Sequence, residues 1–281
     1  MHKNLLIRCL SGLVFIAVMI GGILIHPSLY ALLMLLITGI MTMEYFRMAI
    51  GNRLLFAQCT AIATGWLLFL LFYAVMRHQV GSVWFLLLVV PVTLIWIGFL
   101  YQKREEDYAL SAHLFIPLIY ITLPFSLTNF LVFDASGCFS GTTLLSLFVV
   151  LWASDVGAYA IGMSFGQKNG HKLFPRISPK KSWEGYIGGA LTALLAGFVV
   201  YRLHWLPFPL VHCFVLALLL HVFGVWGDLA ESQLKRHYHL KDSGKIMPGH
   251  GGLLDRFDSA LLAFPVAIAY MKLLILIQTG S

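Results

Sequence analysis

The chain has 281 residues, of which 59% are hydrophobic and 11% are charged, and its formal net charge at pH 7 is +7. Soluble domains are about 45–50% apolar and about 25% charged, so this composition excludes a water-soluble globular fold. We therefore expect an all-α polytopic integral membrane protein.

Nine apolar runs are long enough to cross about 30 Å of hydrocarbon as helices. We predict about nine transmembrane helices within one membrane domain. Residues 1–140 form a generic helical half, whereas in residues 141–281 the apolar runs alternate with strongly charged segments. In chain order, the runs cover residues 9–26, 28–46, 54–76, 80–101, 110–133, 142–163, 185–201, 208–227 and 259–278.

The lysine and arginine residues lie mainly on one side of this predicted domain. Sixteen of the nineteen fall in the amino-terminal segment and in every second loop after it. The positive-inside rule therefore predicts a cytoplasmic amino terminus, and an odd number of spans then puts the carboxyl terminus outside. Residues 164–184 and 228–258 hold five cations each. Topology does not require so many, and anionic lipid headgroups or a polyphosphate ligand would explain them better.

Four of the twelve carboxylates lie in or at the ends of apolar runs. Ionisable side chains at membrane depth are costly, so they are candidates for a functional role. The predicted topology places all four toward the cytoplasmic ends of their helices, where they could meet near one membrane face. This favours a site at the inner leaflet over a proton relay through the membrane. The four residues are Glu44, Asp155, Asp228 and Asp258.

Two pairs of carboxylates are spaced three residues apart: Asp228 with Glu231, and Asp255 with Asp258. Residues at this spacing share a helical face. Paired carboxylates beside cationic loops suit Mg²⁺, which prefers oxygen ligands and keeps waters that substrate phosphates can replace. The spacing fits equally well an interfacial cluster of ion pairs, in which Glu231 pairs with Lys235.

The segment SPKKSWEG, residues 178–185, could bind an anion. Pro179 and Ser182 can start a helix, which would leave backbone N–H groups and two lysines, Lys180 and Lys181, facing a phosphate. The alternative is a capped helix whose lysines reach toward the membrane surface, and both interpretations stay open.

A glycine-rich segment, PGHGG at residues 248–252, allows the backbone to approach a ligand closely. It contains His250, a candidate for contacting phosphate or orienting a carboxylate. A zinc site at His237 and His239 is disfavoured because no third ligand stands at a recognisable spacing.

A long signature is spread over residues 232–258. It consists of Ser232-x-Leu234-Lys235-Arg236, Lys241-Asp242-x-Gly244 and Pro248-x-His250-Gly251-Gly252-Leu253-x-Asp255-Arg256-Phe257-Asp258. Together with segments at 154–159, 178–185 and 227–232, it resembles the pattern of the CTP:phosphatidate cytidylyltransferase family, also called CDP-diacylglycerol synthases. The resemblance extends over about residues 150–260. Met247 and Ser182 depart mildly from the family's usual residues and keep the chemistry.

The resemblance implies a nucleotidyltransferase of phospholipid biosynthesis. Such an enzyme transfers CMP from CTP to phosphatidic acid, gives CDP-diacylglycerol and pyrophosphate, and requires Mg²⁺. Its partners would be CTP, phosphatidic acid and membrane lipids, with no nucleic acid. Its site would open at the cytoplasmic leaflet of the inner membrane. A second cation in the site and a homodimer are left open.

The resemblance also implies roles for individual residues. Asp228 and Asp255 are the first choice for metal ligands, and Glu231 and Asp258 are further ligands or partners of ligands. Lys235 and Arg236 would hold the phosphatidate headgroup or the leaving pyrophosphate. The CTP phosphates would contact Ser178, Lys180 and Lys181, and the remaining site-lining residues would be Lys241, Asp242, His250 and Arg256.

Two other classes of protein remain as alternatives. A CTP-dependent polyprenol or phytol kinase would transfer a γ-phosphoryl group to an alcohol, and the long signature disfavours it. An organic-anion transporter would use cationic loops to attract its cargo. Transporters commonly repeat interrupted helices in two halves, but here the charges gather in the carboxyl-terminal half alone.

Overall fold

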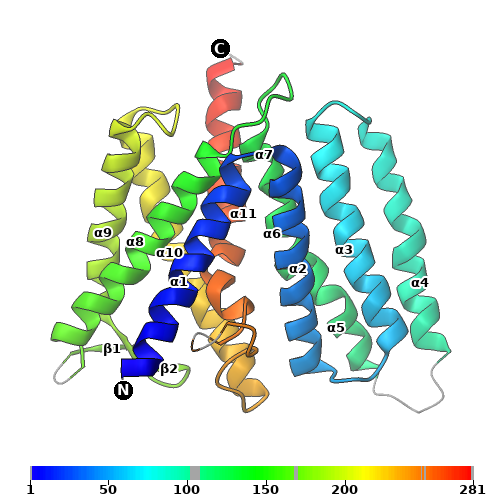
Figure 1. Cartoon of the computed structure of the whole chain (residues 1–281), viewed down its shortest axis with the longest axis horizontal. Helices are drawn as coiled ribbons and strands as arrows, with labels where there is room; N and C mark the ends of the chain where they lie inside the picture. Colours follow the sequence, from blue (N-terminus) through cyan, green and yellow to red (C-terminus); the bar gives the residue numbers. More distant parts are fainter. Residues whose placement is uncertain (1, 102–107, 168–169, 248, 250, 280–281) are drawn as a thin grey trace. The chain divides into compact units, whose positions relative to one another are not determined.

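The structure is a computed structural model that describes residues 2–101, 108–167, 170–247, 249 and 251–279 (Figure 1). The described residues are mostly helical, with one short two-stranded hairpin. They form two compact units, Met1–Ser140 with Tyr238–Arg256, and Gly141–His237 with Phe257–Ser281. The division falls inside the last helix, between Arg256 and Phe257, and each unit is described by itself below.

The first unit contains the amino-terminal helices. A 3₁₀ segment, η1, leads directly into α4, and the two together make one apolar segment, Ser82–Leu100. The helices are α1 (His2–Leu24), α2 (Pro27–Ala49), α3 (Leu55–Met76), η1 (Ser82–Leu88) and α4 (Val89–Leu100).

The last membrane segment of this unit, Ala109–Val132, is interrupted by prolines. Pro117 and Pro124 lack the N–H group that a regular helix needs, so the helix is broken into short pieces around a π turn. The pieces are α5 (Ala109–Pro117), η2 (Leu118–Thr122), α6 (Leu123–Leu127) and α7 (Asn129–Val132). The connection 238–253 also belongs to this unit.

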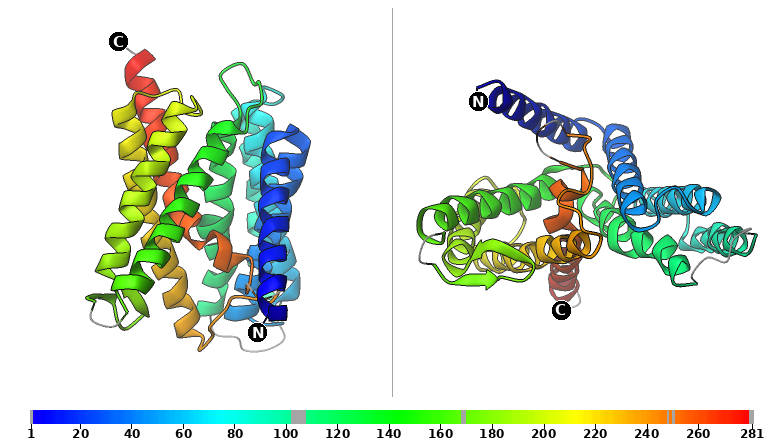
Figure 2. Two further views of the ribbon diagram at one scale, coloured as in Figure 1. Left: turned by 60° about the vertical axis from the view of Figure 1, so that its left-hand side comes forward. Right: turned by 90° about the horizontal axis from the view of Figure 1, so that it is seen from below.

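The second unit is built on α8, α9 and α10, which run side by side (Figures 1 and 2). The antiparallel hairpin β1–β2 lies at one end of α8 and α9, and β2 contacts both helices. The elements are α8 (Thr142–Phe165), β1 (Lys172–Phe174), β2 (Ser178–Ser182), α9 (Trp183–Arg202), α10 (Leu210–His237) and α11 (Leu254–Thr279).

Small residues let the helices of this second unit approach closely. A Cβ atom added to Gly185 of α9 would lie 2.8 Å from the Ala158 carbonyl oxygen of α8. A Cβ on Gly227 of α10 would run into the carbonyl oxygen of Asp258 on α11. Glycine at such positions allows backbone-to-backbone packing. The close approach at Gly227 also brings the neighbouring Asp228 beside the first turns of α11.

The predicted membrane helices are confirmed in eight of the nine runs, and the chain is an integral membrane protein by these spans. Eight described helices are long and apolar enough to cross a membrane, and residues 10–24 of α1 form a shorter apolar helix. The eight spans are Pro27–Ala49, Leu55–Met76, Ser82–Leu100, Ala109–Val132, Thr142–Phe165, Trp183–Arg202, Leu210–His237 and Leu254–Gln278.

Three local expectations were wrong. Helix α10 continues to His237 rather than stopping near residue 227, because Asp228 and Ser232 satisfy each other on its surface. Helix α11 begins at Leu254, so the polar connection covers only 238–253. Pro179 lies in strand β2 and does not start α9, although Ser182 does cap that helix as expected.

Candidate functional site

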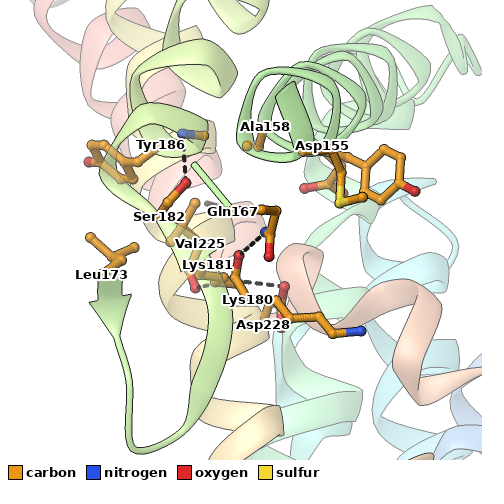
Figure 3. Close-up of a pocket in the computed structure, with 14 residues that line it drawn as sticks. Asp155, Ala158, Gln167, Leu173, Lys180, Lys181, Ser182, Tyr186, Val225 and Asp228 are labelled. Atoms are coloured by element: carbon orange, nitrogen blue, oxygen red, sulfur yellow. Dashed lines mark hydrogen bonds and ion pairs between the residues drawn. The ribbon is translucent and has the colours of Figure 1, made fainter. Parts of the chain in front are cut away.

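A cavity of about 270 Å³ opens between α8, α9, α10 and strand β2, all in the second unit (Figure 3). Its wall combines apolar and aromatic side chains with a small number of charged groups, which is typical of ligand sites. The lining residues are Asp155, Ala158, Tyr159, Gly162, Met163, Gln167, Leu173, Lys180, Lys181, Ser182, Gly185, Tyr186, Val225 and Asp228.

The hairpin places the two predicted lysines at this cavity. Ser182 ends β2 in an extended conformation, and its Oγ accepts a hydrogen bond from the Gly185 N–H at 3.2 Å, so α9 starts at once. The Gln167 amide donates to the Lys180 carbonyl oxygen at 3.0 Å. These two bonds fix the strand on either side of Lys181. Residues 178–182 therefore form a strand that is followed at once by a capped helix, and anion binding at this helix start stays a prediction.

Lys181 and Asp228 form an ion pair at the cavity wall (Figure 3). The Lys181 Nζ lies 2.7 Å from Asp228 Oδ2, and the Ser232 hydroxyl donates to Asp228 Oδ1 at 3.1 Å. About a fifth of the Lys181 side chain and a third of the Asp228 side chain remain exposed. Both charges are thus held in place while staying accessible from the cavity.

Three carboxylates, among them Asp228, lie near Asp258. Asp258, at the start of α11, experiences the negative charges of Asp228, Glu231 and Asp155 together. Like charges brought together repel one another unless a cation neutralises them. Lys235 supplies one such cation, because its Nζ forms an ion pair with Glu231 four residues earlier on α10, and both side chains are largely buried.

The acidic cluster fits a divalent metal by the chemistry of its donors. All four groups are carboxylates, the ligands that Mg²⁺ prefers. In the part of the chain that the structure describes, no three His, Cys, Asp or Glu side chains are arranged to hold a metal as they stand. Lysine ammonium groups instead neutralise Asp228 and Glu231, so a metal would have to replace at least the Lys181 contact.

Asp255 has different partners, which belong to the first unit. Its Oδ2 accepts hydrogen bonds from the backbone N–H of Ser243 at 2.9 Å and of Gly252 at 2.8 Å. Gly251 has φ +84°, a left-handed conformation that favours glycine, and a Cβ there would lie 2.7 Å from this oxygen. One oxygen of Asp255 is therefore committed to the shape of the connection 238–253.

The other predicted site residues are placed as follows. Ser178 pairs with Phe174 across the hairpin and is not among the described residues that line the cavity. Glu44 is bound by the connection 238–253 in the first unit. His250 lies outside the described residues. Five of the predicted site residues are exposed: Lys180, Arg236, Lys241, Asp242 and Arg256.

Sequence reasoning missed a buried histidine beside the cavity. His221 of α10 is 1% exposed, and its Nδ1 lies 2.8 Å from the Ser154 hydroxyl on α8. Its ring also packs on Tyr186, which lines the cavity, with 4.5 Å between ring centroids. A histidine inside an apolar run is the signal that could have identified it. Ser154 precedes Asp155, so this contact supports the cavity wall from behind.

Comparisons with known proteins agree with the motif. Residues 6–274 match the sequence profile of the cytidylyltransferase family. A protein of Bacillus subtilis named phosphatidate cytidylyltransferase is 50% identical over 117 residues, which are 42% of each chain. Proteins of the same name from Staphylococcus saprophyticus and Staphylococcus haemolyticus are 43% and 46% identical over 123 and 125 residues, each covering 44% of this chain and 46% of the relative. The chain thus matches less than half of the length of these relatives.

Proposed function

The chain belongs to the cytidylyltransferase family, and we propose from that premise that it is a phosphatidate cytidylyltransferase. It transfers CMP from CTP to phosphatidic acid and releases pyrophosphate, in phospholipid biosynthesis. The observation that carries this proposal is the Lys181–Asp228 pair in a cavity at the ends of membrane helices. There, a lysine ammonium that can bind phosphate lies beside a carboxylate that can bind a metal ion. Two anionic substrates require positive charge from both sources.

The reaction is a displacement at phosphorus. A phosphate oxygen of phosphatidic acid attacks the α-phosphorus of CTP, a new P–O bond forms, and the bond to the β-phosphate bridging oxygen breaks. The nucleophile is largely ionised near neutral pH, because the second pKa of a phosphate monoester is about 6. No proton needs to be removed, so the protein's task is to align the two phosphates and to neutralise their repulsion.

We assign these tasks to the site residues that the motif predicts. Lys180 and Lys181 bind the CTP phosphates, with Ser178 supporting the hairpin that carries them. Lys235 and Arg236, on the last turns of α10, hold the lipid phosphate or the leaving pyrophosphate. Lys241, Asp242, His250 and Arg256 complete the substrate contacts.

The motif assigns Mg²⁺ first to Asp228 and Asp255, with Glu231 and Asp258 as further ligands or partners of ligands. Of these, Asp228, Glu231 and Asp258 belong to the second unit. When bound, Mg²⁺ would supply Lewis-acid stabilisation of the phosphate charge. With Asp228 holding a metal ion, the Lys181 ammonium would be free to bind substrate phosphate. The flexible lysine stem makes that exchange of partners straightforward.

The membrane arrangement follows the charge distribution. We propose nine spans in one membrane domain, a cytoplasmic amino terminus and an external carboxyl terminus, with the site of residues 141–281 opening at the cytoplasmic leaflet of the inner membrane. The five cations of residues 164–184 support this orientation, because cytoplasmic loops carry an excess of Lys and Arg. Cysteine labelling from each side of sealed vesicles tests it.

The deciding experiment follows the α-phosphate. Purified protein in detergent is given phosphatidate, Mg²⁺ and CTP radiolabelled at the α-phosphate, and the chloroform phase is counted with and without EDTA. We expect metal-dependent label in the lipid, and none with the Asp228→Asn variant. Folded protein that labels no lipid here, but transfers γ-label to a lipid alcohol, would overturn the proposal in favour of a lipid kinase.

Two remaining expectations can be checked on the same preparation. A second cation in the acidic cluster predicts that activity with saturating Mg²⁺ still responds to added K⁺ or Na⁺. A homodimer predicts a protein mass of two chains in the detergent complex, measured by light scattering with the detergent contribution subtracted.

A further inference from the structure

Glu44 of α2 is buried, with 1% of its surface exposed, and its carboxylate binds the connection that follows α10. Oε2 accepts hydrogen bonds from the Ser243 hydroxyl at 3.1 Å and from the Leu254 N–H at 2.8 Å. Oε1 accepts from the Leu253 N–H at 3.0 Å. All these residues belong to the first unit. One carboxylate therefore joins α2 to both ends of the segment 243–254.

This carboxylate acts as a helix cap supplied from another helix. Leu254 is the first residue of α11, and the first N–H groups of any helix lack partners within it. Glu44 accepts from Leu253 and Leu254, and Asp255 accepts from Gly252. A negative charge at this end is also favoured by the helix dipole. Two carboxylates thus satisfy three consecutive N–H groups where the connection enters α11.

Two glycines of the connection leave room for the Glu44 carboxyl group, because they have no Cβ atom. A Cβ on Gly252 would lie 2.7 Å from Glu44 Oε2, and a Cβ on Gly244 would overlap the Glu44 carboxyl group, with its Cδ 2.7 Å away. Neither Gly244 nor Gly252 has a positive φ, so space rather than backbone conformation requires glycine here. The connection is packed directly onto this carboxylate.

A second contact holds the beginning of the same connection. The Tyr45 hydroxyl, next to Glu44 on α2, lies 2.9 Å from His113 Nδ1. The Tyr238 hydroxyl lies 3.4 Å from the Nε2 of the same ring. Tyr238 is the first residue after α10. Helix α2 therefore holds the connection at its start through His113 and at its end through Glu44.

We propose that Glu44 is a positioning residue for the transfer reaction, acting through the connection that carries Lys241 and Asp242 and that is bound by Asp255. The inference rests on the proposed function for its effect on turnover, although its effect on the connection is independent of it. Because Glu44 is 1% exposed, we expect it to act through the groups it binds rather than by contact with substrate. It fixes the backbone on which substrate-contacting side chains stand, and a displacement of about 1 Å in such groups can reduce turnover about 100-fold.

The test compares Glu44→Gln with a control on the same helix. Glutamine keeps the shape but turns an N–H₂ donor toward groups that are themselves donors. Thr38→Val is the control, because Thr38 is equally buried and its hydroxyl donates only to the carbonyl oxygens of Met34 and Leu35 in its own helix. Hydrogen exchange of detergent-solubilised protein, kcat and KM are measured for both variants.

We expect Glu44→Gln to raise amide exchange in residues 243–254 by about tenfold or more, with α8 and α9 unchanged. Turnover should fall about 100-fold, while KM for CTP changes less than about threefold. The Thr38→Val control should leave both unchanged. Unaltered exchange in 243–254 of the Gln variant would overturn the proposal. If wild-type protein transfers no CMP, the proposed function fails, and the exchange result still decides the role of Glu44.

Gly244→Ala, which keeps the Glu44 carboxylate, covers the case in which Glu44→Gln does not fold, and a double-mutant cycle with Glu44→Ala tests the coupling. Gly244→Ala should perturb the connection strongly in the wild-type chain, because its Cβ overlaps the Glu44 carboxyl group. In a Glu44→Ala chain that obstacle is gone, so the same change should have a smaller effect on exchange in 243–254. Effects that simply add would show that Glu44 and the connection are uncoupled, and the proposal would be wrong.

Discussion

In the second unit a lysine side chain neutralises the central carboxylate, Asp228, through an ion pair with Lys181. In the first unit, by contrast, the carboxylates of Glu44 and Asp255 accept hydrogen bonds mainly from backbone N–H groups. A lysine ammonium on a flexible stem can change partners when a metal or phosphate arrives. A backbone N–H group can do so only if the local chain unwinds. The first kind of carboxylate is therefore suited to exchange with ligands, and the second kind to holding a shape.

The largest expected effect comes from the same substitution, Asp→Asn, made in one carboxylate of each kind. Asp228→Asn and Asp255→Asn should each reduce CMP transfer about 1,000-fold, because each removes a proposed ligand of the Mg²⁺ ion that would neutralise the phosphate charge. Only Asp255→Asn should increase amide exchange at Ser243 and Gly252, whose N–H groups it binds. The melting temperature of the Asp228 variant should stay within about 4 °C. A large loss of folded Asp228→Asn protein would contradict the assignment of that residue to exchangeable chemistry.

The next effect tests whether the Lys181 ammonium serves the substrate as well as Asp228. Lys181→Met should lower kcat/KM for CTP about 100-fold, because one cation facing the transferred phosphates is lost. Lys172→Met is the matched control in the same hairpin, where the Lys172 ammonium donates to the Gly166 carbonyl at 3.1 Å outside the cavity lining. Steady-state kinetics should show little change for the control, and equal losses in both variants would point to hairpin folding instead.

A smaller effect concerns the helix contact that brings Asp228 beside Asp258. Gly227→Ala should destabilise the protein by about 1–3 kcal/mol, because its Cβ meets a backbone carbonyl oxygen. Gly224→Ala, one turn earlier, should be milder, since its Cβ meets the movable end of the Leu151 side chain at 2.9 Å. Thermal unfolding in detergent ranks the two, and the reverse order would exclude a backbone contact at residue 227.

The smallest effect uses Asp134, another carboxylate bound by the nearby chain. The Ser136 hydroxyl and the N–H groups of Cys138 and Ser136 hold the pKa of Asp134 below its ordinary value of 3.8. A lowered pKa in the folded state means that its stabilisation is present above that value and is lost as pH falls further. Amide protection at Cys138, corrected for intrinsic rates, should therefore fall in strong acid. The Asp134→Ala variant should lack this pH dependence.

The helices were predictable because the length of an apolar run can be counted directly. The extension of α10 was not predictable, because the apolar run ends at Gly227 while the helix continues through polar residues to His237. Pairs four residues apart, Asp228 with Ser232 and Glu231 with Lys235, satisfy these side chains on the helix surface. Such pairs stabilise a helix only modestly. The sequence alone therefore could not choose between a longer helix and a loop.

The hairpin and the role of Glu44 depend on distant contacts. Strands β1 and β2 have three and five residues, too few for a recognisable alternation of polar and apolar side chains. Glu44 could be singled out as a carboxylate at membrane depth, but its partners stand 199 to 210 residues further along the chain. No local pattern connects positions so far apart. The motif residues located the region of the site, and tertiary structure was needed to tell which carboxylates share a partner.

Helix α10 is longer than the hydrocarbon layer is thick. Its 28 residues extend about 42 Å at about 1.5 Å per residue, against about 30 Å of hydrocarbon. The apolar part, residues 210–227, takes up about 27 Å of that length, close to the thickness of the hydrocarbon layer, so we expect Asp228 near its boundary and the residues up to His237 beyond it. The apolar length of α10 thus sets the depth of Asp228 in the membrane. A bilayer thicker by a few ångströms would leave this carboxylate inside the hydrocarbon layer, which makes the thickness of the host membrane part of the geometry of the site.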